Sequence, residues 1–302
     1  MEKELVKPSV ICFGEMLWDN LPGGRMAGGA PMNVAYHLNT IGAASQLISR
    51  VGNDSPGAEL LEFCNQISLP AALVQTDQVH PTSEVNAKIM AGHEVVYDIV
   101  LNVAWDYISY DAYLDTLVSG ADAFVYGSLA SRNAVSRESL LQLLVSAKFK
   151  VFDVNIRAPH YSKEILNLLL QQANLLKLNN DELELLMELF YKKGTTEADG
   201  IKFIQQEFNI PEIIITKGSE GASYYDTATA IHRKAYAIKV ADTVGAGDSF
   251  LAAFIYKKLK GNPIPYALDY ALGMGAFIAG QIGACPAYTT ADLDNFIRQH
   301  KK

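Results

Sequence analysis

The sequence contains only three cysteines among its 302 residues, Cys12, Cys64 and Cys285, and they lie far apart. It has no CxxC pair and no Cys/His cluster with metal-ligand spacing, so we expect neither a disulfide framework nor a zinc site. A long hydrophobic run without charge is also missing. The most apolar stretch, YALDYALGMGAFIAGQIGA, includes Asp269 and many small residues, which favours helix packing in a soluble core over a membrane span.

The chain has fewer basic than acidic residues. The chain has 25 lysines and arginines against 33 aspartates and glutamates, which gives a net charge of −8. This balance argues against nucleic acid or an anionic membrane surface as a partner. The N-terminal stretch MEKELVKPSVICFGE lacks the long apolar core of a signal peptide, so we expect a cytoplasmic protein. An anionic substrate would need local help from helix N-termini, a few basic side chains or a divalent cation.

Several common catalytic motifs are missing too. The chain has no G-x-x-x-x-G-K-[ST] P-loop, no G-x-G-x-x-G after its first predicted strand and no G-x-S-x-G elbow. What it does have is a composition of 49% hydrophobic and 19% charged residues, which is typical of a folded protein with a large core.

Short β-rich runs alternate with longer segments of helical period, the pattern of a parallel sheet covered by helices. We therefore predict an α/β fold with a mainly parallel central sheet, in one domain spanning residues 1–302. The predicted strands are Val10–Phe13, Gln46–Ser49, Ala123–Tyr126, Val151–Val154, Leu175–Leu178 and Ile213–Thr216. The predicted helices are Pro31–Thr40, Pro56–Gln66, Ser136–Ala147, Asp181–Phe190, Gly200–Glu207, Ser249–Lys258, Pro265–Gln281 and Ala291–His300.

One region departs from this alternation. From Thr82 to Val100, apolar and polar residues partly alternate around Ala91–Gly92, which predicts an inserted β-hairpin. Together with the loop from Asp19 to Ala27, the hairpin could form a small sheet that covers a site or pairs with another subunit. A surface hairpin without a function is the alternative.

The segment DTVGAGDSF places Gly245, Ala246 and Gly247 directly before an apolar helical run. Glycines let the backbone turn tightly, and the first amides of a helix bind anions, so the segment is suited to hold a phosphate. Asp248 could then accept the proton of an attacking hydroxyl, because the neighbouring amides favour its ionised form. The alternative for Asp248 is an ordinary helix N-cap.

Ligands of open α/β sheets bind beyond the carboxyl ends of the strands, and four predicted strands here are followed by polar or glycine-rich segments. These segments are GEMLWDN, NIR, NNDE and TKGSEG. In NNDE, Asn179 and Glu182 can face one cavity and order a hydrated Mg²⁺. A helix cap with acidic residues in the first turn explains the same pattern without a metal. Arg157 of NIR can clamp a phosphate or carboxylate, or it can pair with Asp153.

Taken in order, these motifs resemble the ribokinase-like, or PfkB, carbohydrate kinases. DTVGAGDSF is similar to the family's C-terminal signature, and GGAPMNVAYHLNTIGA with GEMLWDNLP is similar to the N-terminal half of its fructokinase branch. VAWD, DVNIR, KLNNDE and TKGSEGA extend the resemblance over nearly the whole chain. It implies a three-layer sandwich with a small β-sheet lid at about residues 17–27 and 82–102, which in several relatives also forms a dimer interface.

The resemblance also implies roles for individual residues. Asp248 matches the catalytic base, and the backbone of Gly245, Ala246 and Gly247 matches the anion hole. Sugar hydroxyls are expected at Asp19, Gly28, Gly29 and Asn33, the nucleotide at Asn179, Thr216, Gly218 and Gly221, Mg²⁺ at Glu182 through water, and a monovalent cation such as K⁺ at Asp242. Arg157 lies in a segment similar to the D-x-N-x-R of related fructokinases, which implies a substrate or phosphate contact. A plain loop before the next helix is the alternative for Gly28–Gly29.

The sequence thus predicts an ATP- and Mg²⁺-dependent sugar kinase that converts D-fructose to fructose 6-phosphate and forms a homodimer through the lid. A kinase for ribose, tagatose or 2-keto-3-deoxygluconate is the nearest alternative, because hydroxyl-binding residues can change without altering the transfer machinery. A catalytically silent regulatory relative is another, against which the intact Asp248 and glycines count.

Overall fold

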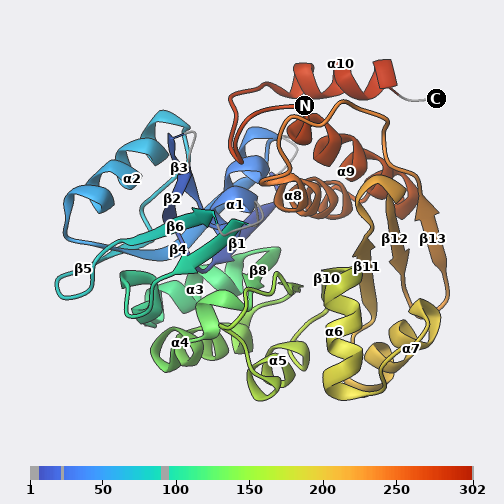
Figure 1. Ribbon diagram of the computed structural model, residues 1–302, viewed down its shortest axis with the longest axis horizontal. Coiled ribbons are helices and arrows are strands. Elements are labelled where there is room, and N and C mark those ends of the chain that lie inside the picture. The colour runs from blue at the N-terminus through green and yellow to red at the C-terminus, as the bar shows by residue number, and fades with distance from the viewer. Residues whose placement is uncertain (1–6, 22–23, 90–94, 301–302) are drawn as a thin grey trace, which may run out of the picture.

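The computed structural model describes residues 7–21, 24–89 and 95–300, and its core is a nine-stranded sheet in the order β13-β12-β11-β10-β9-β8-β1-β4-β5 (Figure 1). From β11 to β5 the strands run parallel, and β12 and β13 are antiparallel additions at one edge. The strands are β1 Ser9–Phe13, β4 Ala44–Gly52, β5 Val74–Asp77, β8 Ala123–Gly127, β9 Lys150–Asp153, β10 Leu175–Asn179, β11 Glu212–Thr216, β12 Ala222–Tyr225 and β13 Ala230–Arg233.

Helices cover both faces of this sheet, which gives the predicted three layers (Figure 1). One layer contains α1 Ala30–Thr40, α2 Ser55–Gln66, α8 Ala246–Leu259, α9 Ile264–Ala279 and α10 Thr290–His300. The other contains α3 Ala112–Gly120, α4 Ala134–Ser146, α5 Lys163–Leu170, α6 Asn180–Phe190 and α7 Glu197–Glu207. Short 3₁₀ turns are η1 Ala104–Tyr107, η2 Leu129–Ser131 and η3 Gly218–Glu220.

Strand β1 shows why the sequence requires two helical layers. Side chains alternate between the faces of a strand, so Val10 and Cys12 pack under α1 and α8, whereas Ile11 and Phe13 pack under the opposite layer. All four are at most 3% exposed. A strand that is apolar on both faces is stable only when both are covered, as in other sheets of mostly parallel strands.

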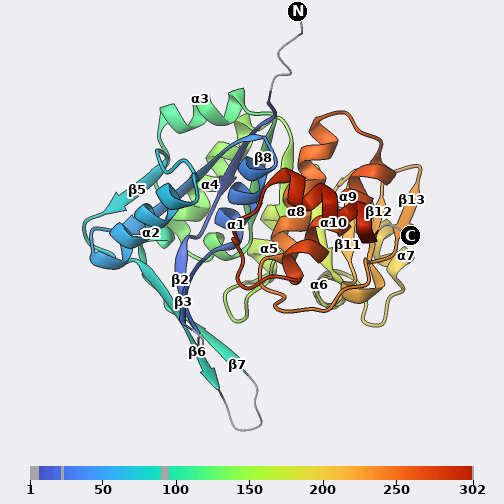
Figure 2. The same ribbon diagram turned by 90° about the horizontal axis from the view of Figure 1, so that it is seen from above.

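A separate small sheet, in the order β3-β2-β6-β7, is formed by β2 Leu17–Leu21, β3 Gly24–Gly28, β6 Ser83–Ile89 and β7 Val95–Ile99. Figure 2 shows β6 and β7 extending away from the body of the molecule. The predicted hairpin is therefore confirmed in its strands, and its predicted turn at Ala91–Gly92 lies outside the described residues. The small sheet predicted from the hairpin and the segment Asp19 to Ala27 is also confirmed: the described residues of that segment belong to β2 and β3, and residues 17–20 of β2 pair in parallel with β6.

The remaining differences from the prediction are local. Strand β9 ends at Asp153, so Val154 lies beyond it, and α8 begins at Ala246 rather than Ser249. Strands β5, β12 and β13 and helices α3 and α5 were not predicted. Among the described residues, no helix is both long enough and apolar enough to cross a membrane.

Candidate active site

A buried ion pair lies at the carboxyl ends of β9 and β10. Asp153 and Lys177 are paired neighbours across these parallel strands, and the Lys177 Nζ lies 2.9 and 3.1 Å from the two Asp153 carboxylate oxygens. Burial disfavours the ammonium, but the carboxylates of Asp153 and Glu182 outweigh it and raise the pKa of Lys177. The pair therefore fixes a positive charge where ligands of this sheet class bind.

The N-terminus of α8 faces this charge. Its N-cap, Gly245, has a φ of 75°, and a Cβ there would lie 2.7 Å from the Cα of Ala284, so only glycine fits. A Cβ on Gly247 would lie 3.4 Å from the Lys177 Nζ. The Ala246 amide donates to the Thr243 carbonyl at 3.3 Å. The helix N-terminus and the ammonium thus converge on one place, which is suited to an anion.

Asp248 lies in the first turn of α8 and is not its N-cap, so the capping alternative is wrong for this residue. Its Oδ2 accepts a hydrogen bond of 2.8 Å from the Nδ2 of Asn33, on α1. Burial raises the pKa of Asp248 to about 6, and the nearby Asp153 carboxylate adds to the shift, while Asn33 and Lys177 oppose it. A carboxylate with such a pKa is ionised at neutral pH and can accept a proton.

Helix α1 also holds the loop behind the α8 N-terminus. One turn after Asn33, the buried His37 ring lies 2.9 Å from the Ala284 carbonyl through Nε2 and 3.0 Å from the Tyr288 hydroxyl through Nδ1. Because a carbonyl only accepts, Nε2 carries the proton and Nδ1 accepts from Tyr288. Burial lowers the pKa of His37 to about 4, so the neutral ring required by this arrangement persists at neutral pH.

The predicted cation position, Asp242, connects two loops. Its Oδ1 accepts from the Val244 amide at 3.0 Å, and its Oδ2 accepts from the Gly283 amide at 3.1 Å. The predicted residue thus lies beside the loop that packs on Gly245.

A second group of charges lies on the side of the small sheet. A Cβ on Gly28 would collide with the Asp19 carboxylate, which places these two predicted sugar residues in contact. Burial raises the pKa of Asp19 to about 6. Arg157 is exposed and donates to the Ile156 carbonyl at 3.1 Å, and its charge opposes the pKa increases of Asp19 and Asp248. The alternative for Arg157, an ion pair with Asp153, is wrong: in the described part of the chain Asp153 pairs with Lys177.

Gly29 and Glu15 form the start of α1. Gly29 is the N-cap, with a φ of 114°, and a Cβ there would collide with the Glu15 carbonyl. The Glu15 side chain is buried and accepts from the Ala30 amide at 3.3 Å. Burial raises the pKa of Glu15 to about 7. Gly29 therefore allows α1 to begin directly against the backbone of the segment after β1, an approach that a plain loop would not need.

The N-x-x-E segment forms a capping box at the start of α6. The Asn179 Oδ1 accepts from the Glu182 amide, and the Glu182 Oε2 accepts from the Asn179 amide, both at 2.8 Å. The Glu182 Oε1 accepts from the Ile156 amide at 3.0 Å, which fastens the segment after β9 to α6. Burial raises the pKa of Glu182, although the Lys177 ammonium opposes the shift. The capping interpretation is correct, and it places Glu182 beside the Lys177 charge.

The other predicted nucleotide residues follow the next strand. Thr216, the last residue of β11, is the paired neighbour of Asn179 on β10. Gly218 and Gly221 belong to the turn into β12, in which the Lys217 amide donates to the Gly221 carbonyl at 2.8 Å. A Cβ on Gly221 would collide with the Arg233 carbonyl, so this turn also requires glycine.

Sequence reasoning missed two residues of this site. Lys177 carried a signal, since a lysine between leucines in a buried strand, LLKLN, needs a buried partner. Glu15 is the second residue after β1, a position where polar side chains at a sheet edge meet ligands.

Comparisons with known proteins point to one family. Residues 22–291 match the pfkB family carbohydrate kinases. A probable fructokinase-5 of Arabidopsis thaliana is 27% identical, with 98% of this chain and 99% of the relative covered.

Among solved structures, a Xylella fastidiosa fructokinase with bound ATP has a TM-score of 0.86 at 19% identity, covering 97% of this chain and 99% of its own. A Vibrio cholerae O395 fructokinase with fructose, ADP and calcium bound has a TM-score of 0.81 at 23% identity, with the same coverage. These two structures establish the likeness in fold. With the family match over most of the sequence, they lead to one conclusion: the chain belongs to the PfkB family of carbohydrate kinases, which transfer a phosphoryl group from ATP to a sugar.

Proposed function

We propose that the sugar is D-fructose and that the product is fructose 6-phosphate. The observation that carries the proposed chemistry is the hydrogen bond between Asn33 and Asp248, which joins a predicted sugar residue to the predicted base at 2.8 Å. The choice of fructose is supported by curated relatives named as fructokinases, among them one 27% identical over 98% of this chain.

In the proposed reaction, Asp248 accepts the proton of the sugar hydroxyl as its oxygen attacks the γ-phosphorus of ATP. The bond from that phosphorus to the bridging oxygen breaks, and ADP leaves with the electron pair. The α8 N-terminus from Gly245 to Gly247 and the Lys177 ammonium stabilise the negative charge on the moving phosphoryl group. Because their positions are fixed by packing and by Asp153, little reorganisation is needed during transfer.

The site fits Mg²⁺ carried mainly by the nucleotide and water. Within residues 7–21, 24–89 and 95–300, no three His, Cys, Asp or Glu side chains converge as a metal cage. Mg²⁺ commonly keeps several waters and binds through substrate phosphates with one or two carboxylates. Glu182 would hold it through water, since each of its oxygens accepts one amide and retains further acceptor capacity. When bound, the ion neutralises phosphate charge.

The small sheet, made of β2, β3, β6 and β7, is proposed as the lid over the sugar. It carries Asp19, and a closed lid would exclude water from the phosphoryl group. K⁺ binding near Asp242, dimerisation through the small sheet and a cytoplasmic location remain predictions from the sequence.

A sugar acid is the second candidate substrate. The exposed Arg157 guanidinium lies on the sugar side, and a guanidinium is well suited to bind a carboxylate. This contact would favour 2-keto-3-deoxygluconate over fructose.

A coupled assay of ADP release distinguishes these candidates. The purified protein is given ATP, Mg²⁺ and one sugar at a time: fructose, ribose, tagatose, glucose or 2-keto-3-deoxygluconate, with ATP alone as the background. The proposal predicts the highest kcat/KM with fructose. A higher kcat/KM with 2-keto-3-deoxygluconate would replace fructose by the sugar acid, and no turnover with any sugar would contradict the kinase activity itself.

A further inference from the structure

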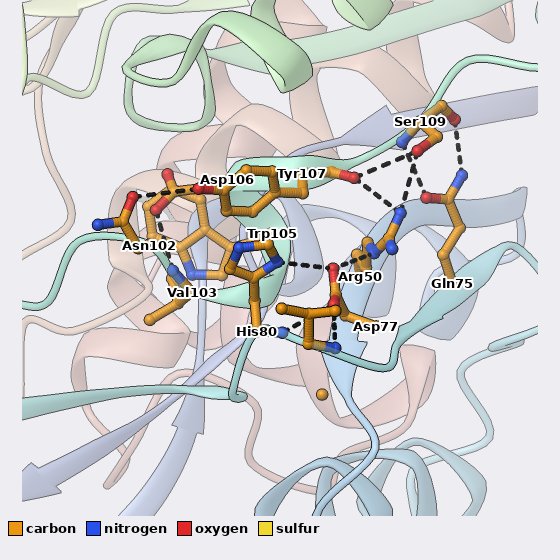
Figure 3. Close-up of polar contacts among 12 residues, drawn as sticks. Arg50, Gln75, Asp77, His80, Asn102, Val103, Trp105, Asp106, Tyr107 and Ser109 are labelled. Carbon is orange, nitrogen blue, oxygen red and sulfur yellow. Dashed lines mark hydrogen bonds and ion pairs between the residues drawn. The ribbon is translucent and has the colours of Figure 1, made fainter.

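The β6–β7 hairpin of the small sheet is inserted in the chain between β5 and η1, and the two segments that connect it to the main body, its roots, lie side by side. The outgoing root leaves β5 at Asp77 and enters β6 at Ser83, and the returning root leaves β7 at Ile99 and enters η1 at Ala104. Figure 3 shows the polar and aromatic side chains between the two roots. The proposed reaction does not use any of these side chains.

Asp77 organises the outgoing root. Its carboxylate is 2% exposed, and its Oδ1 accepts from the Val79 and His80 amides at 2.7 and 2.8 Å. Its Oδ2 lies 2.7 Å from the Arg50 Nε and 3.3 Å from the His80 Nδ1. A buried carboxylate with these partners fixes both the backbone after β5 and the orientation of the His80 ring (Figure 3).

Tyr107 connects the returning root to that ring. The rings of His80 and Tyr107 are stacked, with centroids 3.6 Å apart and planes 12° from parallel. Arg50 donates to the Tyr107 carbonyl at 2.9 Å, so the same arginine binds both roots. The backbone adds one direct link, because the Ala104 amide donates to the Pro81 carbonyl at 2.8 Å.

Strand pairing connects the roots to the sugar side of the site, because β6 pairs with the strand that carries Asp19. Strand β6 starts three residues after His80, and it pairs in parallel with β2 so that Val85 lies opposite Asp19. Thr82, just before β6, donates from its amide to the Asp54 carboxylate at 2.8 Å. A change in the angle of β6 at its root would therefore displace Asp19.

We propose that His80 and Tyr107 are positioning residues for the sugar: their stack joins the roots of the β6–β7 hairpin and thereby sets where β2, which pairs with β6, presents Asp19. The inference rests on the proposed role of the small sheet as the lid. Neither residue touches the sugar or the nucleotide in this account. Replacing them should therefore raise the KM for sugar more than the KM for ATP.

The decisive variants are Tyr107→Leu, which removes the stack, and Tyr107→Phe, which keeps it and loses only the hydroxyl that donates to Asn102 at 3.1 Å. Tyr110→Leu is the matched control, because Tyr110 is 39% exposed in the same segment. Tyr107→Leu should raise the KM for sugar about threefold to tenfold, the size expected for one aromatic stack, with kcat and the KM for ATP nearly unchanged. Tyr107→Phe and Tyr110→Leu should behave as wild type.

A double variant with His80→Leu tests whether the two rings act together. The rise in KM of the double variant should match that of either single variant, since each alone already removes the stack. A KM increase in the double variant equal to the product of the two single increases would overturn the proposal. An unchanged KM for sugar in Tyr107→Leu would overturn it too, as would a Tyr107→Phe protein with the same increase in KM as Tyr107→Leu.

Amide hydrogen exchange tests the same inference without catalysis. Exchange in residues 83–89 should be faster in Tyr107→Leu than in wild type and unchanged in Tyr107→Phe. If wild type phosphorylates no sugar, the proposed function fails, while this exchange result still decides whether the stack holds the roots. Equal exchange in wild type and Tyr107→Leu would overturn the inference.

Discussion

At the transfer end of the site, charged groups are held by buried partners, whereas at the sugar end they are partly or largely open to solvent. Asp153 and Lys177 are 4% and 7% exposed and bind each other, and Asp248 is bound by the buried Asn33. Asp19 is half-buried on the small sheet, and Arg157 is exposed. The difference shows which part of the site the packed core fixes. Phosphoryl transfer depends on rigid placement, while the choice of sugar can change through a few peripheral side chains.

The largest effect is expected at the transfer end, from Asp248→Asn. The variant keeps the shape of the side chain but cannot take a proton, so kcat should fall about 10³-fold, as expected for loss of a general base. Binding of ATP and sugar should persist in calorimetry. Near-normal turnover in the folded variant would rule out Asp248 as the base.

The same variant should also be more stable above pH 6. The pKa of Asp248 is raised from 3.8 to about 6 on folding, so its ionised form costs folding free energy above that pH and nothing below the unfolded value. Removing the charge should raise the free energy of unfolding at pH 8, by at most about 3 kcal/mol. Urea unfolding of both proteins at pH 8 and pH 3 measures this difference, which should vanish at the lower pH.

The next largest effect is expected from Gly245→Ala. The new methyl group would lie 2.7 Å from the Ala284 Cα, so the α8 N-terminus must shift, and kcat should fall about 10²-fold, in the range for loss of a charge-stabilising donor. Gly261→Ala is the matched control: its φ of 73° carries the same backbone strain, but no atom lies within 4 Å of the new Cβ. Equal losses in kcat would show that strain, and not the anion site, is responsible.

Lys177→Met separates charge from packing. Removing the ammonium leaves Asp153 buried without its partner, so the variant should lose about 3–5 kcal/mol of stability and much of its activity. Adding Asp153→Asn removes the unpaired buried carboxylate and should restore most of the stability, but not kcat. Recovery of both in the double variant would mean that Lys177 acts only through folding.

The smallest effect is expected at the exposed sugar end, from Arg157→Ala. Loss of one charged hydrogen-bond donor should raise the KM for sugar about tenfold, with little change in kcat or stability. Steady-state kinetics with fructose and 2-keto-3-deoxygluconate measures it. An equal loss for both sugars would indicate a shared contact, while a loss confined to the acid would assign Arg157 to its carboxylate.

Much of the fold and part of the site could be predicted from sequence, but the contacts that make the two ends differ could not. The α/β fold followed from the alternation of apolar runs, and the α8 N-terminus followed from its glycines, because both signals are local. The hydrogen bond between Asn33 and Asp248 joins residues 215 positions apart, and the Asp153–Lys177 pair depends on which strands are neighbours. The stacking of His80 on Tyr107 likewise depends on the two roots meeting. Such contacts are set by tertiary packing, which local patterns do not specify.

The most direct test of the central claim compares the pH dependence of kcat/KM for sugar, at saturating ATP, in wild type and in Asp248→Asn. Wild-type kcat/KM should fall as the pH drops through about 6, where Asp248 becomes protonated, and the residual activity of the variant should lack this decrease. The same decrease in both proteins would show that another group controls it, and would contradict the assignment of Asp248 as the base.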